Sequence, residues 1–146
     1  MKRKYELDET VFNEINGYSA YWIGYLYGDG NCTCENKIRL CCKQEDKEVL
    51  IMFRSFIKCI TKPIKDFISQ GKYPCSSFEV RSWKLHNELK KYDVCKIKSK
   101  RGLINIDLLQ DSVSKDFLRG LFDADGCFYF DGLHKNNLFA EITGYK

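Results

Sequence analysis

The sequence predicts an α+β fold, with helices packed on one face of a single antiparallel sheet. Apolar side chains at helical three- and four-residue spacing alternate along the chain with short stretches of apolar-polar alternation. The predicted order is helix, hairpin, helix, hairpin, helix, which suits one compact unit. With 146 residues, of which 44% are hydrophobic, the chain is long enough to enclose a core.

The N-terminal part is expected to hold two helices followed by a hairpin. Residues 8–16 (DETVFNEIN) begin with Asp8, a favoured N-cap residue, and Gly17 breaks this first helix. The run from Tyr18 to Tyr27 is almost wholly apolar, so this second helix is expected to be buried on most sides. Residues 37–42 alternate between two strand faces, and pair with a strand at residues 32–33 through a turn at residues 35–36.

The rest of this unit repeats the pattern of helix and hairpin. Apolar side chains at helical spacing predict a helix over residues 46–60, which covers the apolar face of the hairpin and ends before Pro63. Two strands follow, around Phe67 and over residues 78–81, separated by a turn at residues 70–72 and by Pro74. A short helix from Trp83 to Tyr92 completes the unit.

Composition and charge limit the classes of function. The formal net charge is +4, and six cations fall in residues 90–101. This favours a polyanionic partner, although such a run is as often a solvated loop. No apolar run reaches membrane-spanning length and no signal peptide is recognisable, so we expect an intracellular protein without a membrane partner. The eight cysteines include no CxxC pair, which disfavours structural zinc.

The most informative feature is a repeat, in which the start of the chain recurs 96 positions later. YWIGYLYGDGNCT (residues 21–33) matches FLRGLFDADGCFYF (residues 117–130). The matched positions are small residues, an acid and a final glycine: Gly24 with Gly120, Gly28 with Ala124, Asp29 with Asp125, and Gly30 with Gly126. Agreement at all of these positions indicates two related units.

Each copy of the repeat presents two small residues four apart, on one face of a helix. Such faces let helix backbones approach closely, so we expect the two strips to pair, Gly24 and Gly28 with Gly120 and Ala124. This pairing brings Asp29 and Asp125 together at two helix C-termini, where their charges repel. A divalent cation removes the conflict. Carboxylates, water and phosphate oxygens are the ligands of a Mg²⁺ site that cleaves phosphodiesters.

The paired motifs resemble those of the LAGLIDADG homing endonucleases. The second copy, LRGLFDADG at residues 118–126, differs from the family's name string only at Arg119 and Phe122. The first copy, at residues 22–30, is looser but keeps its glycines and its last acid. The resemblance implies a saddle of αββαββα repeats with sheets in the DNA major groove. It also implies that Asp29 and Asp125 bind Mg²⁺ or another divalent cation and that the chain cleaves double-stranded DNA.

Polar side chains on the predicted strands suit contact with DNA. A two-stranded ribbon fits the major groove, so four side chains are expected to reach base edges and phosphates: Lys37, Arg39, Glu79 and Arg81. Gln44 resembles the family position that holds the water network near the metal. Lys98 resembles the basic residue that stabilises charge on the phosphate. Its neighbours Lys96 and Lys100 are alternatives for that role and further candidates for DNA contact.

Other polar residues are expected to have ordinary structural roles. An aspartate before glycine at a helix end is usually a turn residue, and only the repeated match reverses this reading for Asp125. Asp123 has no acidic counterpart, because Tyr27 stands at the equivalent position, so we expect a cap or a solvent contact. His86 and His134 are single histidines, expected to be surface or satisfied polar groups.

The chain is expected to contain one whole repeat and the start of a second. We expect a helical lead-in at residues 1–16, a first repeat at 17–114, and a motif helix with one hairpin at 115–146. The apolar faces of that hairpin, without a covering helix, favour self-association. A two-motif enzyme needs both sheets to hold both half-sites, so an alternative stays open: a module that binds DNA, or intron RNA as a maturase does, without cleavage.

Overall fold

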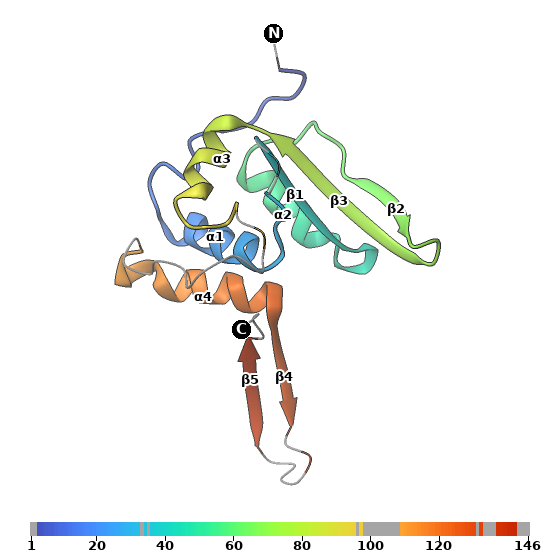
Figure 1. Cartoon of the computed structure of the whole chain (residues 1–146), viewed down its shortest axis with the longest axis vertical. Helices are drawn as coiled ribbons and strands as arrows, with labels where there is room; N and C mark the ends of the chain where they lie inside the picture. The colour runs from blue at the N-terminus through green and yellow to red at the C-terminus, as the bar shows by residue number, and fades with distance from the viewer. Residues whose placement is uncertain are drawn as a thin grey trace.

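The computed structural model describes residues 3–32, 34, 36–95, 97, 109–130, 132 and 137–142. Over these residues the chain is a mixed α+β protein with four α-helices and two antiparallel sheets, in agreement with the predicted class (Figure 1). The helices are α1 (Gly17–Asp29), α2 (Glu48–Phe56), α3 (Trp83–Lys90) and α4 (Asp111–Asp125). The strands are β1 (Lys37–Lys43), β2 (Lys65–Ser69), β3 (Tyr73–Arg81), β4 (Gly126–Phe130) and β5 (Leu138–Ile142), and a 3₁₀ helix, η1 (Gln44–Asp46), follows β1.

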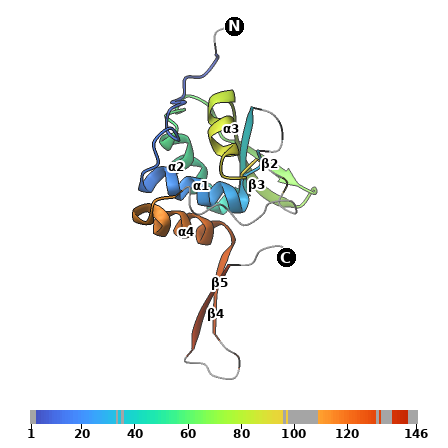
Figure 2. The ribbon, with the colours of Figure 1, turned by 60° about the vertical axis from the view of Figure 1, so that its left-hand side comes forward.

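The first sheet has the strand order β1-β3-β2 and buries one of its faces. On that face Ile38 lies opposite Val80, and Leu40 lies opposite Phe78. All four side chains are at most 1% exposed, because α1, α2 and α3 contact these strands. Figure 2 shows the three helices together on one side of the sheet. The alternation of residues 37–42 therefore has the predicted cause, a strand with one covered face.

Aromatic rings join α1 and α2 to this sheet. The ring of Trp22 in α1 lies 5.1 Å from that of Phe53 in α2, and Phe53 lies 6.3 Å from Phe78 in β3, measured between ring centroids. Leu50 and Phe53 are fully buried, whereas Met52 on the opposite side of α2 is 50% exposed. A buried aromatic ring removes roughly 150–250 Å² from water, so these contacts fix α1 firmly on the sheet.

The helix predicted at residues 8–16 is wrong, because these residues form turns. The Thr10 N–H donates to Asp8 Oδ1 at 2.9 Å, a local bond that replaces the first turn of a helix. Lys58 donates to the same carboxylate at 2.8 Å and, with Thr10, holds the pKa of Asp8 well below its usual range. The first helix begins instead at Gly17, where the Asn16 side chain accepts the N–H groups of residues 18 and 19.

Three predicted boundaries also differ. In place of a strand at residues 32–33 there is one backbone bridge, between Asn31 and Arg39, and residue 33 lies outside the described residues. Helix α2 is shorter than predicted, because Lys58 adopts a left-handed conformation (φ 54°) soon after its end. Pro74 lies inside β3 rather than before it. It is tolerated there because β1 ends at the pair Lys43–Cys75, so position 74 has a partner on β2 alone.

The C-terminal part consists of α4 and a separate hairpin of β4 and β5. Helix α4 lies against α1, and the hairpin projects from its end, away from the first sheet (Figures 1 and 2). Among the described helices, none combines the length and the apolar character that crossing a bilayer requires.

Candidate functional site

Helices α1 and α4, which carry the two motifs, lie side by side and run in the same direction (Figure 1). Their contacts follow one order along both helices: Gly17 lies near Asp116, Gly24 near Phe117 and Leu121, and Gly28 near Ala124. A parallel pair has both C-termini at one end. The final residues of the two motifs therefore lie at the same end of the pair.

The contact between the helices is made by their backbones and is reciprocal. A Cβ on Gly24 would collide with the carbonyl oxygen of Phe117 and lie 2.9 Å from the nitrogen of Leu121. A Cβ on Gly120 would collide with the carbonyl oxygen of Tyr21 and lie 3.0 Å from the nitrogen of Tyr25. Phe117 and Leu121 stand 96 positions after Tyr21 and Tyr25, the offset of the repeat. The two helices are thus related by a pseudo-twofold axis, with the same contacts made in both directions.

Both helices also end in the same way, at an aspartate followed by a glycine. The Gly30 N–H donates to the Leu26 carbonyl at the end of α1, and the Gly126 N–H donates to the Phe122 carbonyl at the end of α4. Both glycines have an extended backbone, so the chain leaves each helix without a further turn. A side chain at either glycine would collide with the preceding turn of its own helix, which accounts for the glycine in each motif.

Asp29 and Asp125 are the last residues of this helix pair. Asp29 is exposed and Asp125 is half-buried. A Cβ on Gly28 would lie 3.1 Å from Oδ2 of Asp125, so this carboxylate lies directly against the residue that precedes Asp29. Two carboxylates at two neighbouring helix C-termini, each with its own partial negative charge, form an electronegative site.

The negative charge at this site acts on two partly enclosed groups. Burial, and then the charge of Asp29, raises the pKa of Tyr25. Burial, and then the charge of Asp46 with a smaller contribution from Asp29, raises the pKa of the Cys42 thiol to about 11. Asp46 also raises the pKa of Tyr25. Asp46 is not among the predicted site residues, because nothing in its spacing links η1 to the end of α1.

The donor atoms of the site suit a hard divalent cation. Both candidate ligands are carboxylates, which favour Mg²⁺ over softer metals. Within the part of the chain that the structure describes, no three His, Cys, Asp or Glu side chains form a group that could hold a metal. A cation at Asp29 and Asp125 would take its other ligands from water or phosphate, as Mg²⁺ commonly does.

Asp123 has a partner that its sequence context does not predict. The Tyr21 hydroxyl of α1 donates to Asp123 Oδ2 of α4 at 2.8 Å. The Arg119 guanidinium lies over the Tyr21 ring, 5.0 Å from its centroid. Burial, together with the hydrogen bond, raises the pKa of Tyr21 to about 12. Asp123 is exposed to solvent, as one of the two expected alternatives had it, and it also links the two helices. The only sequence signal was that Tyr21 falls three residues before Gly24.

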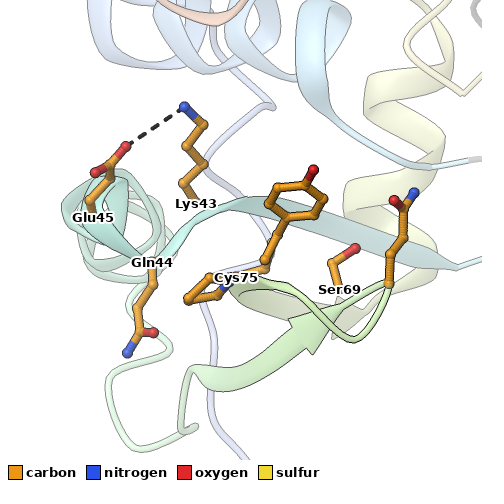
Figure 3. Close-up of a pocket in the computed structure, with 8 residues that line it drawn as sticks. Lys43, Gln44, Glu45, Ser69 and Cys75 are labelled. Atoms are coloured by element: carbon orange, nitrogen blue, oxygen red, sulfur yellow. Dashed lines mark ion pairs between the residues drawn. The ribbon is translucent and has the colours of Figure 1, made fainter.

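Gln44 and three lysines are the predicted site residues that do not belong to the helix pair. Gln44 begins η1 and lines a cavity of about 670 Å³ at the end of the first sheet, together with Lys43 and Cys75 (Figure 3). In Figure 3 its side chain points away from that of Lys43, which forms an ion pair with Glu45 at 3.7 Å. Lys96, Lys98 and Lys100 lie outside the described residues.

The uncovered face of the first sheet, here called the outer face, is basic. Directly paired residues share a face, and those on the outer face include Lys37 with Arg81, Arg39 with Glu79, Lys43 with Cys75, and Lys65 with Ser77. The charged strand residues of this face are five cations and one acid. Glu79 lies between Lys37 and Arg81, at 3.1 Å and 3.8 Å. Lys43 and Lys65 thus share the outer face with the four predicted strand side chains. Lys43 continues the alternation of β1 one residue past the predicted strand, and Lys65 is placed there by the pairing of β2 with β3.

Searches against protein-family models and curated proteins gave no match to this chain. The structure brings Asp29 and Asp125 to one end of a helix pair, with Gly24, Gly28, Gly120 and Ala124 at the contact, whereas Gln44 lies at the end of the sheet.

Proposed function

We propose that this chain is a site-specific DNA endonuclease of the LAGLIDADG type, which hydrolyses phosphodiesters in both strands of duplex DNA. The observation that carries the proposal is the reciprocal α1–α4 pair, which ends in Asp29 and Asp125 on neighbouring helices. Ordinary turn aspartates have no reason to recur at the same end of a close helix pair. Binding of one cation by both carboxylates accounts for that recurrence.

The proposed roles divide between the helix pair and the rest of the site. Asp29 and Asp125 hold Mg²⁺, which, when bound, supplies Lewis-acid stabilisation of the phosphate and a more acidic water. The close contacts at Gly24 and Gly120 keep the two carboxylates at a fixed separation. Lys98 and Gln44 keep the roles that the resemblance implies, charge stabilisation at the phosphate and ordering of water.

The outer face is the proposed surface for duplex DNA. Five strand cations face away from the covering helices, and Arg39 and Lys43 lie on β1, the strand that follows the first motif. Cations in this arrangement neutralise phosphates, and arginine also reads guanine edges in the major groove. Because α1, α2 and α3 occupy the other face, DNA can approach the first sheet from this side.

A second candidate function is supported by the other hairpin. On β4 and β5 themselves Glu141 is the only charged residue, so these two strands offer phosphates no cation. The first sheet alone would then hold one half-site. A module that binds DNA, or intron RNA, without cleaving it fits this asymmetry.

Cleavage is tested with a plasmid library that carries random inserts, because the target sequence is unknown. Ends produced in Mg²⁺ are captured and sequenced. We expect Asp29→Asn and Asp125→Asn each to lower the yield of a recurrent double-strand break at least about 100-fold, as for loss of one electrostatic stabiliser. Asp123→Asn is the matched control, since it makes the same change two residues away and keeps an acceptor for Tyr21.

Binding is tested separately, by measuring affinity for the same library in Ca²⁺ at several salt concentrations. Replacing Arg39 and Lys43 with Gln is expected to make the slope of log K against log salt shallower by about two units. Lys84→Gln with Lys90→Gln, on α3, is the matched control. Salt-dependent binding without Mg²⁺-dependent breaks would support the second candidate. Absence of salt-dependent binding would overturn both.

A further inference from the structure

A polar contact crosses the helix pair near the proposed metal ligands. It consists of the Tyr21 hydroxyl, which donates to Asp123 at 2.8 Å, and Arg119, which lies over the Tyr21 ring. Tyr21 is only 9% exposed and is also held by the ring of Trp22, 5.1 Å away and edge-on. The hydroxyl is therefore presented to α4 by a side chain with little freedom to move.

The same positions meet on the other side of the pseudo-twofold axis, with different chemistry. Phe117 and Tyr27 stand at the positions equivalent to Tyr21 and Asp123, and their rings lie 6.3 Å apart in an edge-on contact. Phe117 has no hydroxyl, so this side cannot reproduce the bond from position 21. The symmetric helix pair thus carries the bond from position 21 on one side and a ring contact in its place on the other.

This asymmetry matters because the small residues at the α1–α4 contact fix the distance between the helices better than they fix the position of one helix along the other. Glycine provides no side chain to interlock with the partner helix, so the strip limits sliding and rotation only through backbone contacts. A directional hydrogen bond has one best position, and single polar pairs are known to fix register between helices. Asp123 lies in the last turn of α4, two residues before Asp125.

We propose that Tyr21 and Asp123 are positioning residues, which fix the last turn of α4 against α1 and so set where Asp125 lies relative to Asp29. The effect on cation binding rests on the proposed function, but the effect on the helix end does not. Arg119 supports the contact by holding the Tyr21 ring from outside. The link bears on the end of α4 and not on the end of α1, because its acceptor lies in the last turn of α4 while its donor lies in the first half of α1.

The variants are Tyr21→Phe and Asp123→Ala, which remove the donor and the acceptor, and Asp123→Asn, which keeps an acceptor oxygen. Tyr18→Phe is the control for loss of a hydroxyl, because Tyr18 is 77% exposed on the same helix. The first readout is hydrogen exchange of two equivalent amides, Gly126 at the end of α4 and Gly30 at the end of α1. Both donate to the carbonyl four residues earlier in their own helix.

We expect Tyr21→Phe and Asp123→Ala to speed exchange at Gly126 at least fivefold, with Gly30 changed less than twofold, and Asp123→Asn to restore most of the protection. Equal acceleration at both amides would mean general loosening and would overturn the proposal, as would no change at Gly126. Asparagine behaving like alanine would attribute the effect to charge and would also overturn it.

The second readout is binding of Mn²⁺ to the protein without DNA, followed by proton relaxation of water. Affinity is expected to fall at least fivefold in Tyr21→Phe and to stay within twofold of wild type in Tyr18→Phe. If wild-type protein binds no Mn²⁺, the proposed metal centre fails, while hydrogen exchange still decides whether the helix end is positioned. If Mn²⁺ binds equally to wild type and Tyr21→Phe, the positioning proposal fails and the metal centre stands.

Discussion

The strands that directly follow the two motif helices differ in what covers them. Ile38 and Leu40 of β1 are at most 1% exposed beneath α2, whereas Phe128 and Phe130 of β4 are 65% and 63% exposed. The motif helices nevertheless pair closely and reciprocally. The α1–α4 contact is therefore present although no described helix covers the second hairpin. The proposed metal site lies on α4, which packs against α1, and not on the exposed hairpin.

The largest effect is expected from Gly24→Val or Gly120→Val, which break this helix pair directly. Each new side chain would collide with a carbonyl oxygen of the opposite helix, and helix backbone has little room to relax. We expect a loss of about 3 kcal/mol or more in the free energy of unfolding. Urea titration followed by circular dichroism measures this loss.

The matched control for this prediction is Gly132→Ala, where an added Cβ meets nothing within 4 Å. Its expected change is within about 0.5 kcal/mol. If Gly24→Val unfolds at the same urea concentration as wild type, the close approach of α1 and α4 is refuted. A fall in stability confined to α4, seen by hydrogen exchange, would instead show that the first repeat folds without its partner helix.

Much of the architecture was predictable because its signals are local. The apolar run at residues 18–27 and the alternation at 37–42 each reflect the burial of one element. The lead-in at residues 8–16 was mispredicted because Asp8 is an equally good acceptor for a turn, and the bond to Lys58 comes from a residue far along the chain. Lys43 was not assigned to the outer face because the predicted strand ended one residue earlier, and Lys65 because its face depends on the pairing of β2 with β3, which tertiary contacts set.

For the candidate site, the repeat gave more information than any single motif. Matching Gly24 with Gly120 predicted that these two glycines lie at the helix contact. The contact is reciprocal, so the residues that each glycine meets on the opposite helix are also 96 positions apart. The Tyr21–Asp123 bond was not predictable in the same way, since it is the point at which the two copies differ. Asp46 was missed because its proximity to Tyr25 and Cys42 arises from the path of the chain after β1.

A smaller effect is expected from making the uncovered hairpin polar. We propose that its apolar side chains drive self-association, because both faces are exposed and Glu141 is the only charge on its two strands. Phe128→Thr with Phe130→Thr is expected to raise the dissociation constant for self-association at least about tenfold. The unfolding free energy is expected to fall by only about 1 kcal/mol, for loss of the ring contact between Phe128 and Phe122 of α4 at 4.7 Å. Sedimentation velocity at several micromolar concentrations measures this change.

Tyr18→Thr is the control for the hairpin, since it removes an exposed aromatic side chain far from β4 and β5. An equal loss of association in this variant would mean that general surface stickiness is responsible. A wild-type protein that sediments as a monomer throughout the micromolar range would refute the idea that the hairpin faces associate.

The smallest effect tests the asymmetric side of the helix pair through its pH dependence. Burial, together with the bond to Asp123, raises the pKa of Tyr21 to about 12, above the usual value of about 10 for an unfolded chain. The folded state thus holds this proton more tightly, and the resulting stability is present below pH 10 and is lost as pH rises toward 12. Wild type should lose stability faster than Tyr21→Phe over this range, by at most about 1.4 kcal/mol per pH unit.

Urea unfolding of both proteins at several pH values between 9 and 12 tests this difference. Tyr25 and Tyr92, whose pKa values are also raised, titrate in both proteins and cancel in the comparison. The two stability curves should converge as Tyr21 ionises, because a phenolate cannot donate to Asp123 and would repel it. Parallel curves would mean that Tyr21 has the same pKa in the folded and unfolded states, and so makes no bond to Asp123 in solution. The polar link would then not distinguish one side of the helix pair from the other.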